Sequence, residues 1–207
     1  MPPVTVIENA DDDAIAAWLA GRLRAALAAT PGVVAITVPG GSTPFPILAA
    51  LVRDAGIDWG RIDVWPGDDR LVPEDHPASN VGRIRALLEP AGARVTALAE
   101  GATPPRFVLA WLGMGEDGHI ASLFPSTDPR VDEPRPVRRL TPDPLPPEAP
   151  FDRVTLTLPV LLASGELMLV IRGGAKRQVF DAALAGASDL PVARLLGARQ
   201  QPVTCFA

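Results

Sequence analysis

The fold of this chain is decided by residues 107–119, which read FVLAWLGMGEDGH. Six apolar residues form a run of the length expected for a buried strand, and a glycine-rich turn with polar side chains follows at once. The same arrangement recurs at residues 33–44 (VVAITVPGGSTP), 62–70 (IDVWPGDDR) and 167–176 (LMLVIRGGAK). Each stretch predicts a buried strand whose carboxyl end carries glycines and polar or charged residues.

Helical patterns separate the predicted strands. Asp11–Asp13 are expected to cap a helix that runs to about Ala29, because apolar residues recur there on one helical face. Further helices are predicted from Pro44 to about Ala55 and over 79–88, 159–163 and 176–184, and further strands over 95–98, 154–158 and 202–206. Alternating strands and helices predict an α/β, Rossmann-like fold: a mostly parallel sheet with helices on both faces, in one domain of residues 1–207.

Residues 125–150 interrupt this alternation, because nine of these 26 residues are proline. Proline lacks a backbone N–H and breaks helices. The segment is therefore expected to be a Pro-rich excursion over the surface, in which residues 137–141 could form a short edge strand.

Composition and charge exclude several classes of protein. The 207 residues are 47% apolar and carry a formal net charge of −5, and no run of about 18 apolar residues occurs. The acidic N-terminus lacks the basic and apolar regions of a signal peptide. We therefore expect a cytoplasmic protein that binds neither nucleic acid nor membranes. The lone Cys205 and two histidines exclude an intramolecular disulfide and a zinc-finger cluster, and no metal site is expected.

The glycine-rich turns are expected to meet, because the carboxyl ends of parallel strands share one rim of the sheet and ligands bind there. Gly40 and Gly41 would let the backbone approach a ligand, and Ser42 and Thr43 precede a helix whose unpaired N–H groups attract phosphate. An ordinary tight turn with a Ser or Thr cap is the alternative. Lys176 is the only lysine among 19 basic residues, which favours a phosphate contact over a solvated lysine.

Two more turns supply candidate site residues. At residues 68–70, Arg70 could supply a phosphate-binding guanidinium oriented by its carboxylate neighbours Asp68 and Asp69. A surface turn with an internal ion pair is the alternative. His119 follows Asp117 by two residues on a glycine-rich turn, a position suited to a general base at neutral pH. A capping or core histidine is the alternative there, and His76 is expected to be such a structural residue.

Taken together, these strings resemble the 6-phosphogluconolactonase family of the pentose phosphate pathway. The matching segments are 39–44 (PGGSTP), 68–80 (DDRLVPEDHPASN), 112–125 (LGMGEDGHIASLFP), 153–159 (RVTLTLP) and 173–176 (GGAK). The resemblance implies a Rossmann-like fold shared with glucosamine-6-phosphate deaminase and ribose-5-phosphate isomerase. It also implies hydrolysis of 6-phospho-D-glucono-1,5-lactone to 6-phosphogluconate without a cofactor. We expect a monomer or a small homo-oligomer whose partner is this small-molecule sugar phosphate.

By position in these strings, the resemblance implies that His119 activates water and that Asp117 orients it or contacts sugar hydroxyls. Arg70, Lys176, Ser42 and Thr43 would hold the phosphate, and Gly40, Gly41 and Asp68 complete the candidate substrate-binding residues. The family usually has Glu where this chain has Asp69, a shorter carboxylate that would reach Arg70 less well.

Two other functions stay open from the sequence. A glucosamine-6-phosphate deaminase would share the Gly-Gly-Ser-Thr and Asp-Gly-His elements but place a catalytic Glu five residues after its histidine, where this chain has Phe124. A non-catalytic paralogue that only binds sugar phosphates is the second alternative.

Overall fold

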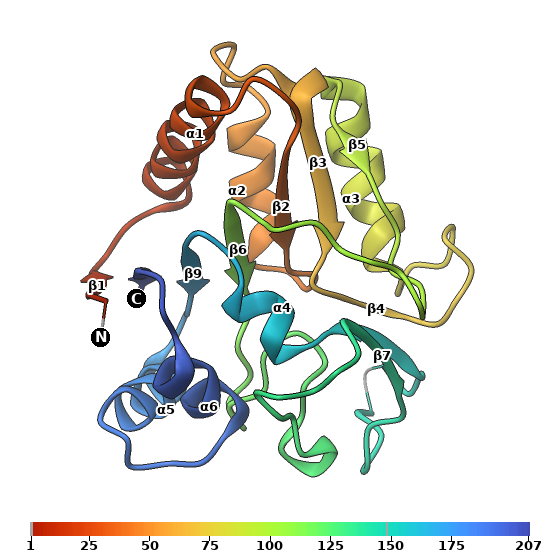
Figure 1. The fold of residues 1–207 in the computed structure, drawn as a ribbon, viewed down its shortest axis with the longest axis vertical. Coiled ribbons are helices and arrows are strands. Elements are labelled where there is room, and N and C mark those ends of the chain that lie inside the picture. Colours follow the sequence, from red (N-terminus) through yellow and green to blue (C-terminus); the bar gives the residue numbers. More distant parts are fainter. Residues whose placement is uncertain (1, 148) are drawn as a thin grey trace.

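The protein is a three-layer α/β structure built around one parallel sheet (Figure 1). The computed structural model describes residues 2–147 and 149–207. In this part of the chain the sheet has seven strands in the order β1-β10-β9-β6-β2-β3-β5, and every neighbouring pair is parallel. The strands are β1 (Val4–Ile7), β2 (Val34–Val38), β3 (Ile62–Pro66), β5 (Arg94–Val95), β6 (Leu109–Leu112), β9 (Leu167–Val170) and β10 (Val203–Phe206). The predicted fold class is confirmed.

The order of the strands reverses between β2 and β6. The chain first moves outward from β2 to β3 and β5, then returns to place β6 on the other side of β2 and continues to β9 and β10. Connections on the two sides of such a reversal diverge and leave a crevice beyond the carboxyl ends of the strands. The turns after β2 and β6, at Pro39 and Gly113, lie beside this crevice.

Two hydrophobic cores cover the two faces of the sheet, because side chains alternate along each strand. On β6, Trp111 belongs to one core and Leu112 to the other; on β9 the same holds for Met168 and Leu169. One core contains residues of α1 (Asp12–Ala29), α2 (Pro44–Leu51) and α3 (Asn80–Leu88). The other contains residues of α4 (Leu158–Leu162), α5 (Gly174–Leu184) and α6 (Pro191–Ala198). Helices therefore cover both faces, as predicted.

A second, smaller sheet differs from the prediction. Strands β4 (Asp68–Arg70), β8 (Arg153–Leu156) and β7 (Val137–Leu140) form an antiparallel sheet in the order β4-β8-β7. Residues 68–70, expected to be a turn, are thus a strand that pairs with β8. Strand β1 and helix α6 were also not predicted from the sequence. Short 3-10 helices complete the fold: η1 (Trp59–Arg61), η2 (Glu89–Ala91) and η3 (Pro125–Thr127).

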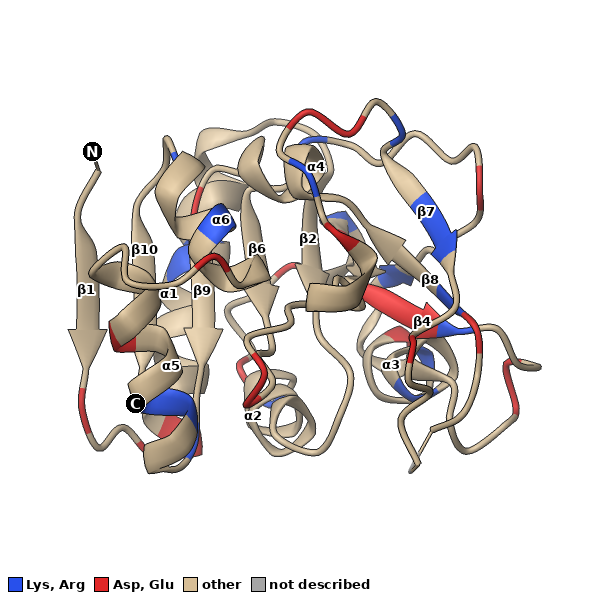
Figure 2. Cartoon of the chain, turned by 90° about the horizontal axis from the view of Figure 1, so that it is seen from below, with Lys and Arg blue, Asp and Glu red and all other residues tan. Residues whose placement is uncertain are grey.

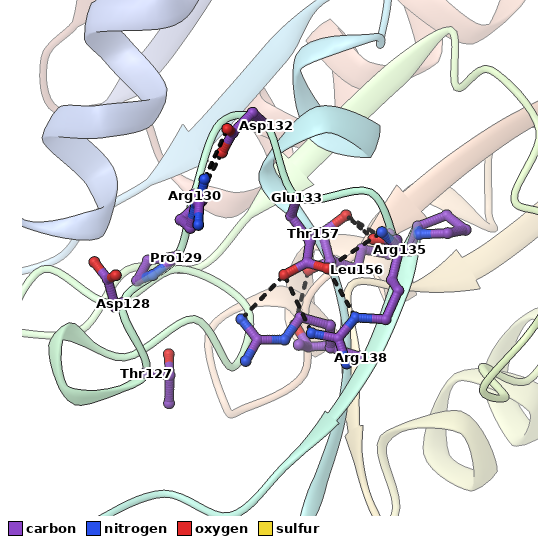
Figure 3. Close-up of polar contacts among 12 residues, drawn as sticks. Thr127, Asp128, Pro129, Arg130, Asp132, Glu133, Arg135, Arg138, Leu156 and Thr157 are labelled. Carbon is purple, nitrogen blue, oxygen red and sulfur yellow. Dashed lines mark hydrogen bonds and ion pairs between the residues drawn. The ribbon is translucent and has the colours of Figure 1, made fainter.

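Among the described residues of the Pro-rich excursion, the regular elements are η3 and the edge strand β7, which was predicted. Glu133 anchors the segment: its carboxylate lies 2.8 Å from Arg135 Nε and 3.5 Å from Arg138 Nη1 (Figure 3). The Thr157 hydroxyl donates to the carbonyl of Arg135 at 2.8 Å. These contacts fix residues 133–138 of the excursion against the start of α4.

Charged residues of both signs are interspersed along the chain and form no single basic stripe (Figure 2). None of the helices in residues 2–147 and 149–207 combines the length and the hydropathy needed to cross a membrane. The charge distribution agrees with the net charge of −5 and leaves any anion site dependent on a few local cations.

Asp63 on β3 is a buried carboxylate that joins two strands. Its oxygens accept from Arg94 Nε and Nη2 at 3.1 and 2.9 Å, from Thr96 Oγ1 at 2.8 Å and from Trp65 Nε1 at 3.0 Å. Burial alone would raise the pKa of Asp63, but the hydrogen bonds, led by that of Arg94, outweigh it and lower the pKa. The carboxylate is therefore a stabilising charge in the folded protein.

Asp63→Asn is expected to lower the free energy of unfolding by about 1–3 kcal/mol at neutral pH, because charge-assisted hydrogen bonds are lost. A depressed folded pKa stabilises the protein above the unfolded value of about 3.9, and this contribution disappears as the pH falls through the folded pKa. The difference between wild type and variant should therefore shrink in urea unfolding at about pH 3. Asp58→Asn, at an exposed carboxylate, is the control. A difference that persists undiminished in acid would contradict the account.

Candidate active site

A cavity of about 280 Å³ opens at the carboxyl ends of the central strands, on the side of α2. Eight of the nine residues singled out from the sequence line it: Gly40, Gly41, Ser42, Thr43, Asp68, Arg70, His119 and Lys176. They come from four separate segments: the turn after β2, strand β4, the turn after β6 and the start of α5. The ninth, Asp117, does not line the cavity and instead contacts His119.

The turn after β2 forms one wall of the cavity. Gly41 has a φ of +87°, a left-handed conformation that glycine adopts without strain. Thr43 is the N-cap residue of α2, and its hydroxyl makes no capping bond to any described residue. Pro44 and Pro46 remove two of the first N–H groups of α2, so this helix terminus offers fewer donors than its sequence position predicted. Hydroxyl groups and cationic side chains must therefore supply the other hydrogen-bond donors for an anion.

Arg70 extends from β4 into the cavity, and its guanidinium is held by groups that the sequence did not indicate. Nη1 donates to the carbonyl of Ala78 at 3.0 Å and to Asn80 Oδ1 at 3.1 Å. No carboxylate among the described residues contacts the guanidinium, so the expected orientation by neighbouring carboxylates is wrong. The loop between β4 and α3 provides the acceptors instead.

Asp69 has a different task. Its carboxylate accepts from the backbone N–H groups of Arg70, Asn80 and Val81 at 2.8, 2.6 and 2.9 Å and so ties β4 to the start of α3. Burial raises the pKa of Asp69 more than these N–H donors lower it. The sequence analysis expected Asp69, which is shorter than the usual Glu, to reach the Arg70 guanidinium less well. In the structure the Asp69 carboxylate binds backbone N–H groups, so it does not position the guanidinium.

His119 and Asp117 form a hydrogen-bonded pair on the turn after β6. His119 Nδ1 lies 2.6 Å from Asp117 Oδ1, and the His119 backbone N–H donates to the same oxygen at 3.2 Å. The hydrogen bond from His119 is the main cause that lowers the pKa of Asp117, which is therefore a carboxylate and can only accept. In the neutral imidazole the proton consequently sits on Nδ1, and Nε2 keeps its lone pair.

Two neighbours fix the place of the His119 ring. Gly115 leaves room for it, because a Cβ at this position would lie 2.3 Å from the ring atoms Cε1 and Nδ1. The backbone N–H of Gly115 also donates to the His119 carbonyl at 3.0 Å. On another side the Phe124 ring lies 4.7 Å from the imidazole, centroid to centroid.

Lys176 lies in the first turn of α5, and it has no carboxylate partner among the described residues. The adjacent Arg177 behaves differently: it pairs with Glu8 at 2.6 Å and Asp181 at 2.9 Å and does not line the cavity. The ammonium of Lys176 is therefore the uncommitted cation of the two.

Three residues of the site, Asn80, Met114 and Ser122, escaped the sequence reasoning. Asn80 and Met114 line the cavity, and the buried Trp111 forms part of its wall. Ser122 Oγ donates to Asp68 Oδ2 at 2.5 Å. The sequence did not indicate Asn80 as a site residue, because its place at the cavity depends on how the loop after β4 folds. No group of three or more metal-ligating side chains occurs within residues 2–147 and 149–207.

The fold is that of a doubly wound α/β protein, with a cavity lined by Arg70 and Lys176 at its topological switch point. The chain belongs to the family of glucosamine-6-phosphate isomerases and 6-phosphogluconolactonases: the family model matches residues 9–93 and 88–204. Two relatives are the 6-phosphogluconolactonases of Pseudomonas aeruginosa and Pseudomonas putida, 38% and 35% identical to it. The alignments cover 93% of this chain in both cases, and 84% and 89% of the relatives.

A solved structure is similar as well. The crystal structure of a 6-phosphogluconolactonase from Shewanella baltica OS155 superposes with a TM-score of 0.83 at 26% identity, covering 100% of this chain and 97% of that chain. The family resemblance stated from the sequence is therefore confirmed, and it extends over the whole length of the chain.

Proposed function

We propose that this protein hydrolyses 6-phospho-D-glucono-1,5-lactone to 6-phosphogluconate, a reaction of the pentose phosphate pathway. One observation carries the proposal: His119, held by Asp117, shares a single cavity with the cations Arg70 and Lys176. A base and an anion site within one small cavity suit a substrate that carries both an electrophilic carbonyl and a phosphate. The names of the relatives support the same activity.

Arg70, Lys176 and the hydroxyl groups of Ser42 and Thr43 hold the phosphate in this proposal. Guanidinium and ammonium groups form charge-assisted hydrogen bonds with phosphate oxygens. Because the phosphate is remote from the carbonyl, its binding energy serves to place the lactone in front of His119. Asp68 lines the same cavity and is suited to accept from a sugar hydroxyl.

The chemical step needs one base. His119 Nε2 takes a proton from a water molecule while the water oxygen bonds to the lactone carbonyl carbon. Asp117 accepts from Nδ1 and stabilises the imidazolium that forms. The bond between the carbonyl carbon and the ring oxygen then breaks, and the imidazolium returns its proton to that oxygen. One water is consumed, and a carboxylic acid and a hydroxyl group are formed.

Deamination of glucosamine 6-phosphate is less well supported. That reaction is associated with a catalytic Glu five residues after the histidine, and this chain has Phe124 there, with its ring against the imidazole. A phenyl ring neither donates nor accepts a proton. A sugar-phosphate-binding paralogue without activity would not need the His119–Asp117 pair. That the enzyme works in the cytoplasm, as a monomer or small homo-oligomer and without a cofactor, stays a prediction.

The test is an assay of freshly generated 6-phosphogluconolactone, coupled to the oxidation of the 6-phosphogluconate formed. We expect a rate well above spontaneous hydrolysis, and no ammonia from glucosamine 6-phosphate. Ammonia release, or a lactone rate equal to the spontaneous one, would overturn the proposal.

The same assay tests the phosphate site with adjacent basic residues. Lys176→Met is expected to lower kcat/KM by about tenfold or more, because a charged hydrogen bond to the phosphate is lost. Arg177→Met is the matched control: it removes a cation one residue away whose partners are Glu8 and Asp181, outside the cavity. Equal losses in the two variants would mean that Lys176 has no specific contact with substrate.

A further inference from the structure

Asn80, the first residue of α3, connects three parts of the cavity wall. The residue is 1% exposed, yet it lines the cavity. Its Oδ1 accepts from Arg70 Nη1 at 3.1 Å, and its Nδ2 donates to the Asp68 carbonyl at 3.0 Å. Because the carboxamide uses its acceptor and its donor on different partners, its orientation is fixed.

The turn after β2 is shaped to accommodate this side chain. A Cβ at Gly40 would lie 2.0 to 2.4 Å from the Oδ1, Cγ and Nδ2 atoms of Asn80. Real Cβ atoms essentially never approach another atom so closely. The missing side chain at Gly40 therefore lets the carboxamide of Asn80 sit directly beneath the turn that carries Ser42 and Thr43, and it fixes the spacing between that turn and Arg70.

The contacts of Arg70 show which of its N–H groups are occupied and which are left for a ligand. Nη1 is saturated by Ala78 and Asn80, whereas Nε is buried without a partner and Nη2 has no acceptor among the described residues. Holding Nη1 stops rotation of the planar guanidinium and decides which N–H groups remain for a ligand. Without Asn80, Nη1 would be held by the backbone carbonyl of Ala78 alone.

We propose that Asn80 is a positioning residue that acts through Arg70 and makes the cavity select phosphorylated over unphosphorylated lactones. This inference rests on the proposed lactonase function. Asn80 contacts the guanidinium and the Asp68 carbonyl rather than the reacting atoms, so its effect falls on the binding of the phosphate and not on the transfer of protons.

The test compares wild type, Asn80→Ala and Asn80→Asp on 6-phosphogluconolactone and on unphosphorylated glucono-1,5-lactone. Asn80→Ala is expected to raise KM for the phosphorylated lactone by about tenfold, because one hydrogen bond to a charged group is lost, with little change in kcat. Asn80→Asp keeps the shape but places a carboxylate against Arg70, so it should raise KM further. The kcat/KM for the unphosphorylated lactone should change less than about twofold in either variant.

Arg70→Met provides the decisive comparison. If Asn80 acts through Arg70, adding Asn80→Ala to Arg70→Met produces almost no further loss. Additive losses, or equal losses on both lactones, would assign Asn80 a general structural role and overturn the inference. Thermal unfolding of each variant checks the fold, and Asn80→Asp keeps the test valid if the alanine variant is unstable.

A binding measurement separates this inference from the proposed function. Calorimetric titration with inorganic phosphate needs no turnover. Asn80→Ala should weaken phosphate binding by about tenfold in the wild-type background. When Asn80→Ala is added to Arg70→Met, phosphate binding should not weaken further. If the wild type is inactive but phosphate binding changes in this way, the lactonase proposal is refuted and the positioning of Arg70 by Asn80 is retained. If the wild type is active but the Asn80→Ala variant binds phosphate normally, the lactonase proposal is retained and the role of Asn80 is refuted.

Discussion

Replacement of His119 by alanine is expected to lower kcat for lactone hydrolysis by about 10²- to 10⁴-fold, the usual contribution of a general base. The reason is geometric: Asp117 occupies Nδ1 at 2.6 Å, so Nε2 is the ring nitrogen that can accept a proton from water. KM should change little, because the cations that hold the phosphate are unaffected. Steady-state kinetics on freshly generated substrate, corrected for spontaneous hydrolysis, measure both constants.

The chain offers His76 as the control histidine. Its Nδ1 accepts from the Ala78 N–H at 3.1 Å, and its ring packs edge-on against Phe151 at 5.4 Å. His76→Ala therefore disturbs the loop that provides an acceptor for Arg70, and any effect should appear in KM. A variant at position 119 that hydrolyses the lactone as fast as wild type would remove His119 from the mechanism.

The parts of the site that could be predicted from sequence are those that follow from strand periodicity. Buried strands are marked by apolar runs, and polar residues directly after them must lie at the carboxyl rim of a parallel sheet. This reasoning led to Thr43, Arg70, His119 and Lys176, which come from segments far apart in the chain and line one cavity. The glycines of the same turns indicate close approach, as at Gly40.

The remaining features depend on loop geometry, which leaves no periodic signal. Asn80 becomes an acceptor for Arg70 only because Asp69 binds the backbone N–H groups at the start of α3 and draws that helix toward β4. From the residue types alone, an Arg beside two carboxylates suggests an internal ion pair. In the structure the Asp69 carboxylate is buried and binds backbone donors, and Asp68 accepts from Ser122, so among the described residues neither carboxylate pairs with the guanidinium.

Short elements were missed for a related reason. Strand β4 has only three residues, Asp68–Arg70, and none is apolar. It is a strand because β8 pairs with it, through the register of Asp69 with Val154. Tertiary pairing of this kind outweighs local propensity, in which Asp is unfavourable for strands. Sequence patterns therefore predicted β7 and β8 of the second sheet but missed β4, the strand that carries Arg70.

Gly115→Ala is expected to lower kcat by about a hundredfold, although alanine adds only one methyl group. The new Cβ would lie 2.3 Å from His119 Cε1 and Nδ1 and 2.6 Å from Asp117 Oδ1. Contacts closer than 3.0 Å essentially never occur for real Cβ atoms, so the imidazole must retreat and its hydrogen bond to Asp117 must lengthen or break. A misplacement of about 1 Å in a reacting group is enough for a loss of this size.

Gly21→Ala is the matched control, because Gly21 lies within α1 with no atom near its Cβ position. This variant should keep full activity and gain about 0.5–1 kcal/mol in the free energy of unfolding, since alanine favours the helix. For Gly115→Ala, the phosphate site is intact, so the affinity for inorganic phosphate should stay within about twofold of wild type while kcat falls. Normal kcat in a correctly folded variant would show that the ring of His119 tolerates displacement, and the general-base geometry would then need to be abandoned. A parallel loss of phosphate affinity would instead indicate collapse of the whole cavity. The separate origins of the two groups argue against this, because His119 lies on the turn after β6, whereas Arg70 lies on β4 and Lys176 in α5.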